Sequence, residues 1–409
     1  MLSSKMLSAY RGFPRSIYII FVVQIINRFG DFVVPFLTLY LTIKLGLSFG
    51  TTGLIVMVAS VVSIPGSIIG GEFADKLGRK KVYILAQTIA GMLLIPCAFL
   101  NNPSAIVICI ILATFFNGAV RPAINSMIAD ILPPHRRQLG YSLNYLGVNV
   151  GVAIGPILAG FLFNHSLPLL FIGDAITSFI AVSLVLIYVD EVDPLTSEVA
   201  VTAEEKDESG NLLEVMLKRP KIIIFLLISI LYSAVYIQQR FSLPIMLDNI
   251  FLAQGPEKFG LLMSVNALTV LILTIWVTHI TRRLKHLTNM VIAGVLYAIG
   301  FGMVGYISTF YMFMISTILW TLGEILMATN FGVYIANHSP RNYRARFSAL
   351  SGLNNAIGGA LGTLLMGIYI GINGIKAVWN LTFVLSCTGA LLMFLLSVYS
   401  SKKQAKQLS

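Results

Sequence analysis

Three charged side chains within apolar stretches are the residues best placed to do chemistry in this sequence. Arg28 and Asp31 lie in the first stretch, and Glu324 lies in a later one. A charge is costly in hydrocarbon, so it faces the interior of a helix bundle and marks a functional path. Helical spacing puts Arg28 and Asp31 on one face, where they can form an ion pair. We predict that Asp31 and Glu324 bind and release protons; for Asp31 a structural ion pair is the alternative.

Polar residues accompany these charges. Four of them are expected at the same site as Asp31 and Glu324: Gln24, Asn27, Asn117 and Arg121. Arg121 could pair with Asp31 or Asp130, or bind an anionic group of a substrate. Asp174 lies nearer the end of its stretch, where a structural role is the stronger prediction.

Aromatic and polar side chains gather in two stretches of the second half. We predict that they line a cavity for amphipathic or cationic organic molecules, because aromatic rings attract cations; packing against neighbours or lipid is the alternative. Arg240 could instead extend its charged end to the membrane surface. The predicted cavity residues are Tyr232, Tyr236, Gln239, Arg240, Trp320 and Phe331.

The elements that carry these residues are predicted to be membrane helices. Hydrophobic residues make up 57% of the 409 residues and charged residues only 11%, and the mean hydropathy is +0.86. Too few charges are present to cover a soluble surface, and the apolar runs are long enough to cross a bilayer as helices. Continuous runs, without strict alternation, argue against a β-barrel. Twelve spans are predicted, at approximately 16–43, 48–74, 82–101, 104–131, 140–163, 167–189, 221–247, 257–281, 288–308, 309–336, 347–371 and 376–400.

Basic residues are distributed unevenly around these spans. Of the 28 Lys and Arg residues, 22 fall on one side, and only Lys44, Lys258 and Lys376 fall on the other. This asymmetry predicts that both termini are cytoplasmic. The net charge of +11 therefore reflects topology, and scattered short-loop charges argue against nucleic-acid binding.

The chain divides into two related halves. A polar segment at 190–220 separates residues 1–189 from 221–409, and nine of the 17 acidic residues fall in it. Shifting the sequence by 207 residues aligns 128–160 with 335–367, with 11 of 33 positions identical. The sequence therefore predicts two six-helix bundles joined by a linker, with a site near mid-membrane between them.

The loop between the second and third predicted spans carries a specific motif. It reads Gly-Glu-Phe-Ala-Asp-Lys-Leu-Gly-Arg-Lys-Lys from Gly71 to Lys81. This resembles the G-x-L-A-D-R-x-G-R-K-x loop of the major facilitator superfamily, a family of alternating-access transporters. The resemblance implies a twelve-helix fold and a cytoplasmic gate; glycines there would allow close approach and a tight turn. The predicted gate residues are Gly71, Asp75, Gly78, Arg79, Lys80, Asp130 and Arg137.

Glycines recur at every fourth position in the fifth predicted span. They place one smooth face on the helix for close packing, and a proline adds a kink. The pattern resembles the glycine-proline motif of drug:proton antiporters within that superfamily, and Gly30 followed by Pro35 resembles a first-helix pattern of efflux members. The residues are Gly147, Gly151, Gly155, Pro156 and Gly160.

Together these features predict a monomeric, multi-pass transporter of the bacterial cell membrane. We expect efflux of small amphipathic molecules, including drugs, driven by protons, with no cofactor and no metal. Gln24, Asn27 and Arg28 also faintly resemble the E-x-x-E-R-F helix of peptide carriers, so peptide uptake is an alternative, as is sugar export. A membrane receptor or enzyme is a further alternative; no clustered histidines, Cys/His dyad or phosphate-binding loop supports an enzyme.

Overall fold

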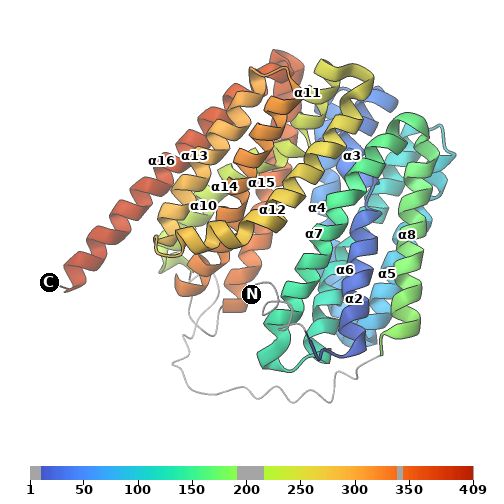
Figure 1. Ribbon diagram of the computed structural model, residues 1–409, viewed down its shortest axis with the longest axis horizontal. Helices are drawn as coiled ribbons and strands as arrows, with labels where there is room; N and C mark the ends of the chain where they lie inside the picture. Colours follow the sequence, from blue (N-terminus) through green and yellow to red (C-terminus); the bar gives the residue numbers. More distant parts are fainter. Residues whose placement is uncertain (1–10, 191–215, 339–343, 409) are drawn as a thin grey trace. The chain divides into compact units, whose positions relative to one another are not determined.

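The computed structural model describes residues 11–190, 216–338 and 344–408. Every regular element in these ranges is a helix, which confirms the predicted all-α fold (Figure 1). Among these residues, eleven stretches are long and apolar enough to cross a membrane. The predicted linker lies largely at 191–215, outside the described residues.

The first half contains six long helical spans. The first is broken into α2 (Arg15–Phe29), α3 (Val33–Leu39) and the π-helical turn η1 (Tyr40–Lys44). The others are α4 (Phe49–Leu77), α5 (Arg79–Leu94) with η2 (Pro96–Ala98), α6 (Pro103–Ile131), α7 (Pro134–His165) and α8 (Leu167–Tyr188).

The second half repeats this order. Its elements are α10 (Pro220–Tyr236), η4 (Ile237–Gln239), α11 (Ser242–Phe251), η5 (Leu252–Gln254), α12 (Gly255–Thr281), α13 (His286–Gly302), η6 (Met303–Gly305), α14 (Phe310–His338), α15 (Arg344–Asn373) and α16 (Ile375–Leu408).

One apolar stretch is far longer than a single crossing requires. Pro220–Thr281 runs for 62 residues, whereas one crossing takes about 20. The short helix η5 divides it, and Leu252 there has a φ of +50°. The stretch therefore holds two spans, and the eleven apolar stretches account for the twelve predicted spans.

The 207-residue repeat of the sequence is also a repeat of the helices. Helix α5 begins at Arg79 and α13 at His286, and the bounds of α6 shifted by 207 are those of α14. Both first spans break at matching places, after Phe29 in one half and after Tyr236 in the other. The halves therefore fold alike, element by element.

Two compact units emerge from the packing. Unit 1 comprises residues 1–46, 58–200 and 251–267, and unit 2 comprises 47–57, 201–250 and 268–409. The first residues of α4 thus belong to unit 2, and the first residues of α12 belong to unit 1. The units are defined by packing, so their boundaries differ from those of the two halves that the sequence repeat defines.

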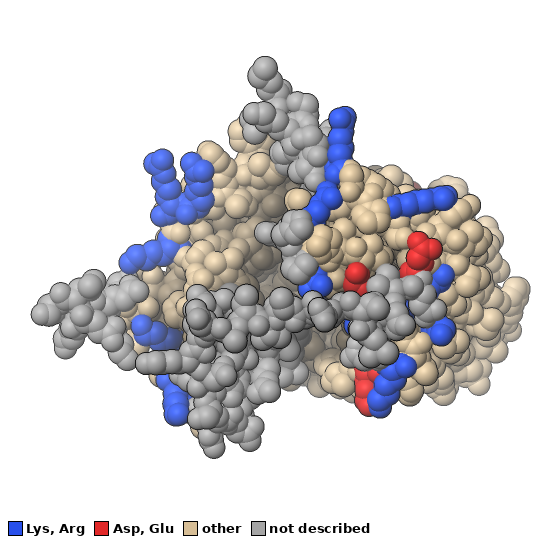
Figure 2. Space-filling model, turned by 90° about the horizontal axis from the view of Figure 1, so that it is seen from below, with Lys and Arg blue, Asp and Glu red and all other residues tan. Residues whose placement is uncertain are grey.

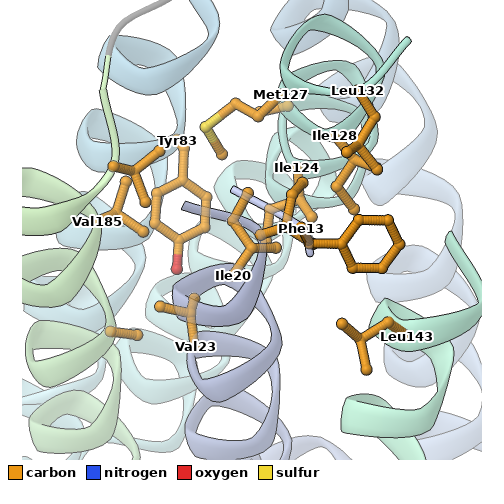
Figure 3. Packing of buried hydrophobic residues seen from close by; sticks show 14 residues of the cluster. Phe13, Ile20, Val23, Tyr83, Ile124, Met127, Ile128, Leu132, Leu143 and Val185 are labelled. Atoms are coloured by element: carbon orange, nitrogen blue, oxygen red, sulfur yellow. The ribbon is translucent and has the colours of Figure 1, made fainter. Parts of the chain in front are cut away.

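The core of unit 1 gathers around Tyr83 of α5. Figure 3 shows its ring among Ile20, Met127 and Val185, which come from α2, α6 and α8. All four side chains are at most 4% exposed. Burying a large aromatic or aliphatic side chain stabilises a fold by about 1.5–3 kcal/mol in water; inside a bilayer, close packing replaces much of that term. This core fixes α2 relative to α5, α6 and α8.

Candidate functional site

The break in the first span places its charged residues. Gly30 ends α2, and α3 does not begin until Val33, so Asp31 lies in the gap. A Cβ atom on Gly30 would lie only 1.7 Å from the Thr177 hydroxyl oxygen. Gly30 therefore allows α8 to contact the backbone directly at the break.

Asp174 of α8 holds the start of α3. Its Oδ2 accepts hydrogen bonds from the backbone N–H groups of Phe32 and Val33, each at 3.2 Å. The Phe32 N–H also bonds the Gly30 carbonyl oxygen at 2.8 Å, and an acidic side chain at a helix N-terminus is electrostatically favourable. Asp174 is only 9% exposed. This is a structural role, the stronger prediction for Asp174, but the sequence could not indicate its partners because they are more than 140 positions away.

Arg28 and Asp31 form the predicted ion pair. Arg28 Nη1 lies 3.0 Å from Asp31 Oδ2, and the two side chains are 40% and 28% exposed. Asn27 Nδ2 donates to the Tyr83 hydroxyl at 3.0 Å, and Gln24 is buried.

The glycine face of α7 packs against α2. A Cβ on Gly147 would lie 2.9 Å from the Phe21 carbonyl oxygen, one on Gly151 2.7 Å from Arg28 Cβ, and one on Gly155 2.4 Å from the Phe29 carbonyl oxygen. Distances this short exclude any larger residue without movement of the helices. The motif therefore determines how closely α7 approaches the helix that carries Arg28.

Two further close contacts at glycines are related by the 207-residue repeat. In unit 1, a Cβ on Gly260 would lie 2.1 Å from the Pro156 carbonyl oxygen. In unit 2, a Cβ on Gly53 would lie 2.5 Å from the Thr363 carbonyl oxygen. Gly53 and Gly260 are related by the 207-residue shift, as are Pro156 and Thr363. A contact of backbone on glycine therefore occurs twice, once in each unit.

Glu324 lies among tyrosines in unit 2. It forms a hydrogen bond with Tyr236 of α10, and Tyr297 of α13 lies within electrostatic range. The ring centroids of these tyrosines are 6.1 Å apart. Arg240, which is exposed, also acts electrostatically on Tyr236. The arrangement combines one carboxyl group, two phenols and one guanidinium.

Several predicted cavity residues lie in the packing instead. Tyr232 and Trp320 are 1% and 0% exposed, and Gln239 is 2% exposed. The Tyr232 hydroxyl donates to the Met290 carbonyl oxygen at 3.2 Å. These three side chains therefore lie in the packing, which is the alternative predicted for the aromatic ones. Tyr236 and Phe331 are half-buried, and Phe331 packs against Phe225.

The predicted gate loop is a one-residue turn. Gly78 separates α4 from α5 with φ +98°, a conformation that favours glycine. Arg79, the first residue of α5, forms an ion pair with Asp130 of α6. Lys80 Nζ donates to the Leu186 carbonyl oxygen at 3.0 Å, and Arg137 Nε donates to the Leu132 carbonyl oxygen at 3.2 Å.

One prediction for this region is wrong, and another concerns a side chain outside the described residues. Gly71 has no atom within 4 Å of an added Cβ, so it does not provide the predicted close approach. That contact belongs to Gly70, whose Cβ would lie 2.2 Å from Ala119 Cβ, and to Gly66. The Asp75 side chain lies outside the described residues.

Arg121 and Asn117 do not join the other predicted site residues. Both are exposed on α6, and no ion pair to Arg121 occurs among the described residues. The suggested pairing of Arg121 with Asp31 or Asp130 is wrong, because these acids pair with Arg28 and Arg79. In the part of the chain that is described, no group of three or more His, Cys, Asp and Glu residues suits a metal ion.

A family comparison accounts for this architecture. The model of the Major Facilitator Superfamily matches residues 20–363 and, in a second match, 239–408. The chain belongs to the Major Facilitator Superfamily. It is therefore a multi-pass membrane transporter of that superfamily, with antiporters and drug-efflux proteins among its relatives.

Two related proteins show which kinds of protein this chain resembles in sequence. A Na(+), Li(+), K(+)/H(+) antiporter of Planococcus maritimus is 25% identical over 353 residues, covering 80% of this chain and 82% of that protein. The quinolone resistance protein NorA of Staphylococcus aureus is 31% identical over 159 residues, covering 38% of this chain and 40% of NorA.

Solved transporter structures share the fold. A peptide transporter POT in complex with sulfate superposes with a TM-score of 0.77 at 17% identity, covering 96% of each chain. The nucleoside transporter NupG superposes with a TM-score of 0.72 at 18% identity, covering 94% of this chain and 99% of its own. Likeness at such low identity shows the fold alone.

Proposed function

We propose that this protein exports small amphipathic organic molecules in exchange for protons, by alternating access. The observation that carries the proposal is Glu324, a carboxyl group of a membrane helix that forms a hydrogen bond with Tyr236 and lies near Tyr297. Such a carboxyl can gain and lose a proton during each transport cycle. Asp31, paired with Arg28, would serve as the proton-binding acid of the first half.

The proposed direction of transport and the proposed membrane orientation rest on separate observations. NorA carries the name of a quinolone resistance protein, which supports export. Seen from below, one face of the molecule carries many Lys and Arg side chains and few acidic ones (Figure 2). The positive-inside rule makes that face cytoplasmic, so both termini would lie inside a bacterial cell.

Exchange of alkali cations for protons is the second candidate. It is favoured by the Planococcus maritimus antiporter, whose similarity extends over 80% of this chain. Both candidates need a carboxyl group that exchanges protons, so Glu324 does not distinguish them. The molecule or ion that is exchanged for protons distinguishes them.

The experiment uses purified protein in proteoliposomes with an imposed pH gradient and an internal pH-sensitive dye. Adding an organic cation such as ethidium should dissipate the gradient if the first candidate holds. Dissipation by Na⁺, Li⁺ or K⁺ alone would instead establish the second. A response only to dipeptides would favour peptide transport and contradict both.

The matched variants are Glu324→Gln and Glu72→Gln. Glu324→Gln should abolish gradient-coupled transport, because the amide cannot carry a proton. Glu72→Gln should leave transport unchanged, because Glu72 is 65% exposed and pairs with Lys76, four positions on in the same helix. Full coupled transport by Glu324→Gln would exclude Glu324 as the proton carrier.

A further inference from the structure

The start of α3 depends on a side chain from another helix. Phe32, the residue that precedes α3, makes no side-chain cap of its own. Asp174 supplies the acceptor, with one carboxylate oxygen bonded to two backbone N–H groups at 3.2 Å. The geometry of the break therefore depends on the Asp174 carboxyl oxygen.

The matching break of the second half is held by a neutral amide. Gln238 Nε2 donates to the carbonyl oxygens of Ala234 and Gly362, at 2.9 and 3.2 Å, and its Oε1 accepts from Ser242. The position that corresponds to Asp174 is Leu381. Folding of a broken first span thus does not require an acid, and the acid in the first half calls for another explanation.

Asp174 lies beside the proposed coupling pair. Among the described residues, the charged groups that act on its carboxylate are Asp31 and Arg28, both from the first span. From α3 it meets backbone N–H groups, and the contact of α5 with α8 nearby is the neutral hydrogen bond between Gln87 and Ser178 at 2.8 Å. Together, the two carboxyl groups and the one guanidinium are neutral when they hold one proton.

We propose that Asp174 is a positioning residue for proton exchange at Asp31. It holds the break so that the Asp31 carboxyl group stays beside Arg28, and its own carboxyl group lies within electrostatic range of Asp31. Proton binding at Asp31 is thereby linked to the angle between α2 and α3. This inference rests on the proposed function, in which Asp31 carries a proton.

The first test separates the charge of Asp174 from its shape. In Asp174→Asn, the amide oxygen can still accept both N–H groups, but the second ionisable carboxyl group near Arg28 is gone. Arg28 and Asp31 are then neutral together without a bound proton, so the pH midpoint of coupled transport should fall by on the order of one pH unit. Ser183→Ala, on the same helix, is the control and should leave the pH midpoint unchanged, because the Ser183 hydroxyl bonds only the carbonyl of Phe179 on its own helix.

The second test reads the break without transport. Spin labels on Tyr18→Cys and Ile43→Cys, at exposed positions of α2 and η1, would report the angle in a background without native cysteines. Asp174→Leu, which copies the second half, should change or broaden the distance distribution. Asp174→Asn should keep the wild-type distribution.

The outcomes distinguish this proposal from the proposed function. An unchanged pH midpoint in Asp174→Asn would overturn the positioning role, because a purely structural cap predicts that result. An unchanged spin-label distribution in Asp174→Leu would overturn the role of Asp174 at the break. If wild-type protein shows no proton-coupled transport, the proposed function fails, and the spin-label result still decides whether Asp174 holds α3.

Discussion

The ion pair between Arg79 and Asp130 joins the first turn of α5 to the last turn of α6. Its side chains are only 18% and 10% exposed, so both charges are largely removed from water. Breaking such a pair costs about 3–5 kcal/mol, because it leaves a desolvated charge. The Arg28–Asp31 pair is more exposed, and a pair of that kind contributes roughly 0–1 kcal/mol. A contribution to stability therefore accounts for the Arg79–Asp130 pair better than for the Arg28–Asp31 pair.

A double-mutant cycle tests the Arg79–Asp130 pair. Arg79→Gln and Asp130→Asn should each lower the melting temperature of the purified protein by several degrees. The double variant should lose less than the sum of the two, because neither charge then remains without its partner. Strictly additive losses would show that the two side chains stabilise the fold independently.

Residue roles were predictable where partners are close in the sequence. Arg28 and Asp31 are one helical turn apart, so their pairing follows from helical spacing. Asp174 and its backbone partners are separated by more than 140 positions, and no periodicity relates them. Arg79 and Asp130, 51 positions apart, are of the same kind. Only packing brings such groups together.

Glycine faces set the spacing of the helices. On α15, a Cβ on Gly358 would lie 2.4 Å from Ser233 Cβ and 2.8 Å from the Ile230 carbonyl oxygen of α10. The neighbouring Gly359 has open space at the same position. Gly151 and Gly155 of α7 make the equivalent contacts with α2 in the first half. One helix thus offers a crowded and an uncrowded glycine side by side.

Gly358→Ala and Gly359→Ala make a matched pair of variants. Gly358→Ala should destabilise the protein and reduce transport, because α10 and α15 must separate to admit the methyl group. Gly359→Ala should stabilise it by about 0.5–1 kcal/mol, since alanine loses less entropy than glycine in a helix. Thermal unfolding followed by size-exclusion chromatography measures the stability of both variants. Equal melting temperatures would contradict the assignment of Gly358 as the crowded position.

Helix positions were predictable, and helix contacts were only partly so. The predicted spans overlap the observed helices, because long apolar runs define them. The sequence also indicated a glycine face on α7, since the spacing of four is visible there. It did not distinguish Gly70 from Gly71, or show that Tyr232 and Trp320 are enclosed, because both depend on the rotation of each helix against its neighbours.

The whole molecule carries its duplication in both sequence and structure. The 207-residue shift relates the bounds of α6 to those of α14 and the break after Phe29 to that after Tyr236. The division into compact units is different, because the first residues of α4 and α12 pack with the other set of helices. Sequence identity between the repeats predicts the former and contains no information about the latter.

Membrane orientation is testable with two single-cysteine variants. In a background without native cysteines, Asn101→Cys should react with a membrane-impermeant maleimide added to intact cells. Lys76→Cys, at an exposed position near the α4–α5 turn, should react only after the cells are permeabilised. The opposite pattern would place the basic face outside and would contradict the proposed orientation.

The 62-residue apolar stretch from Pro220 to Thr281 has a consequence for biogenesis. Two neighbouring spans with only a short connection at Leu252–Gln254 present the insertion machinery with almost no polar loop to translocate. We expect α10–α11 and α12 to leave the translocon laterally as one helical hairpin. The second half of the protein would then begin its assembly in the membrane with a paired unit, before α13 has been synthesised.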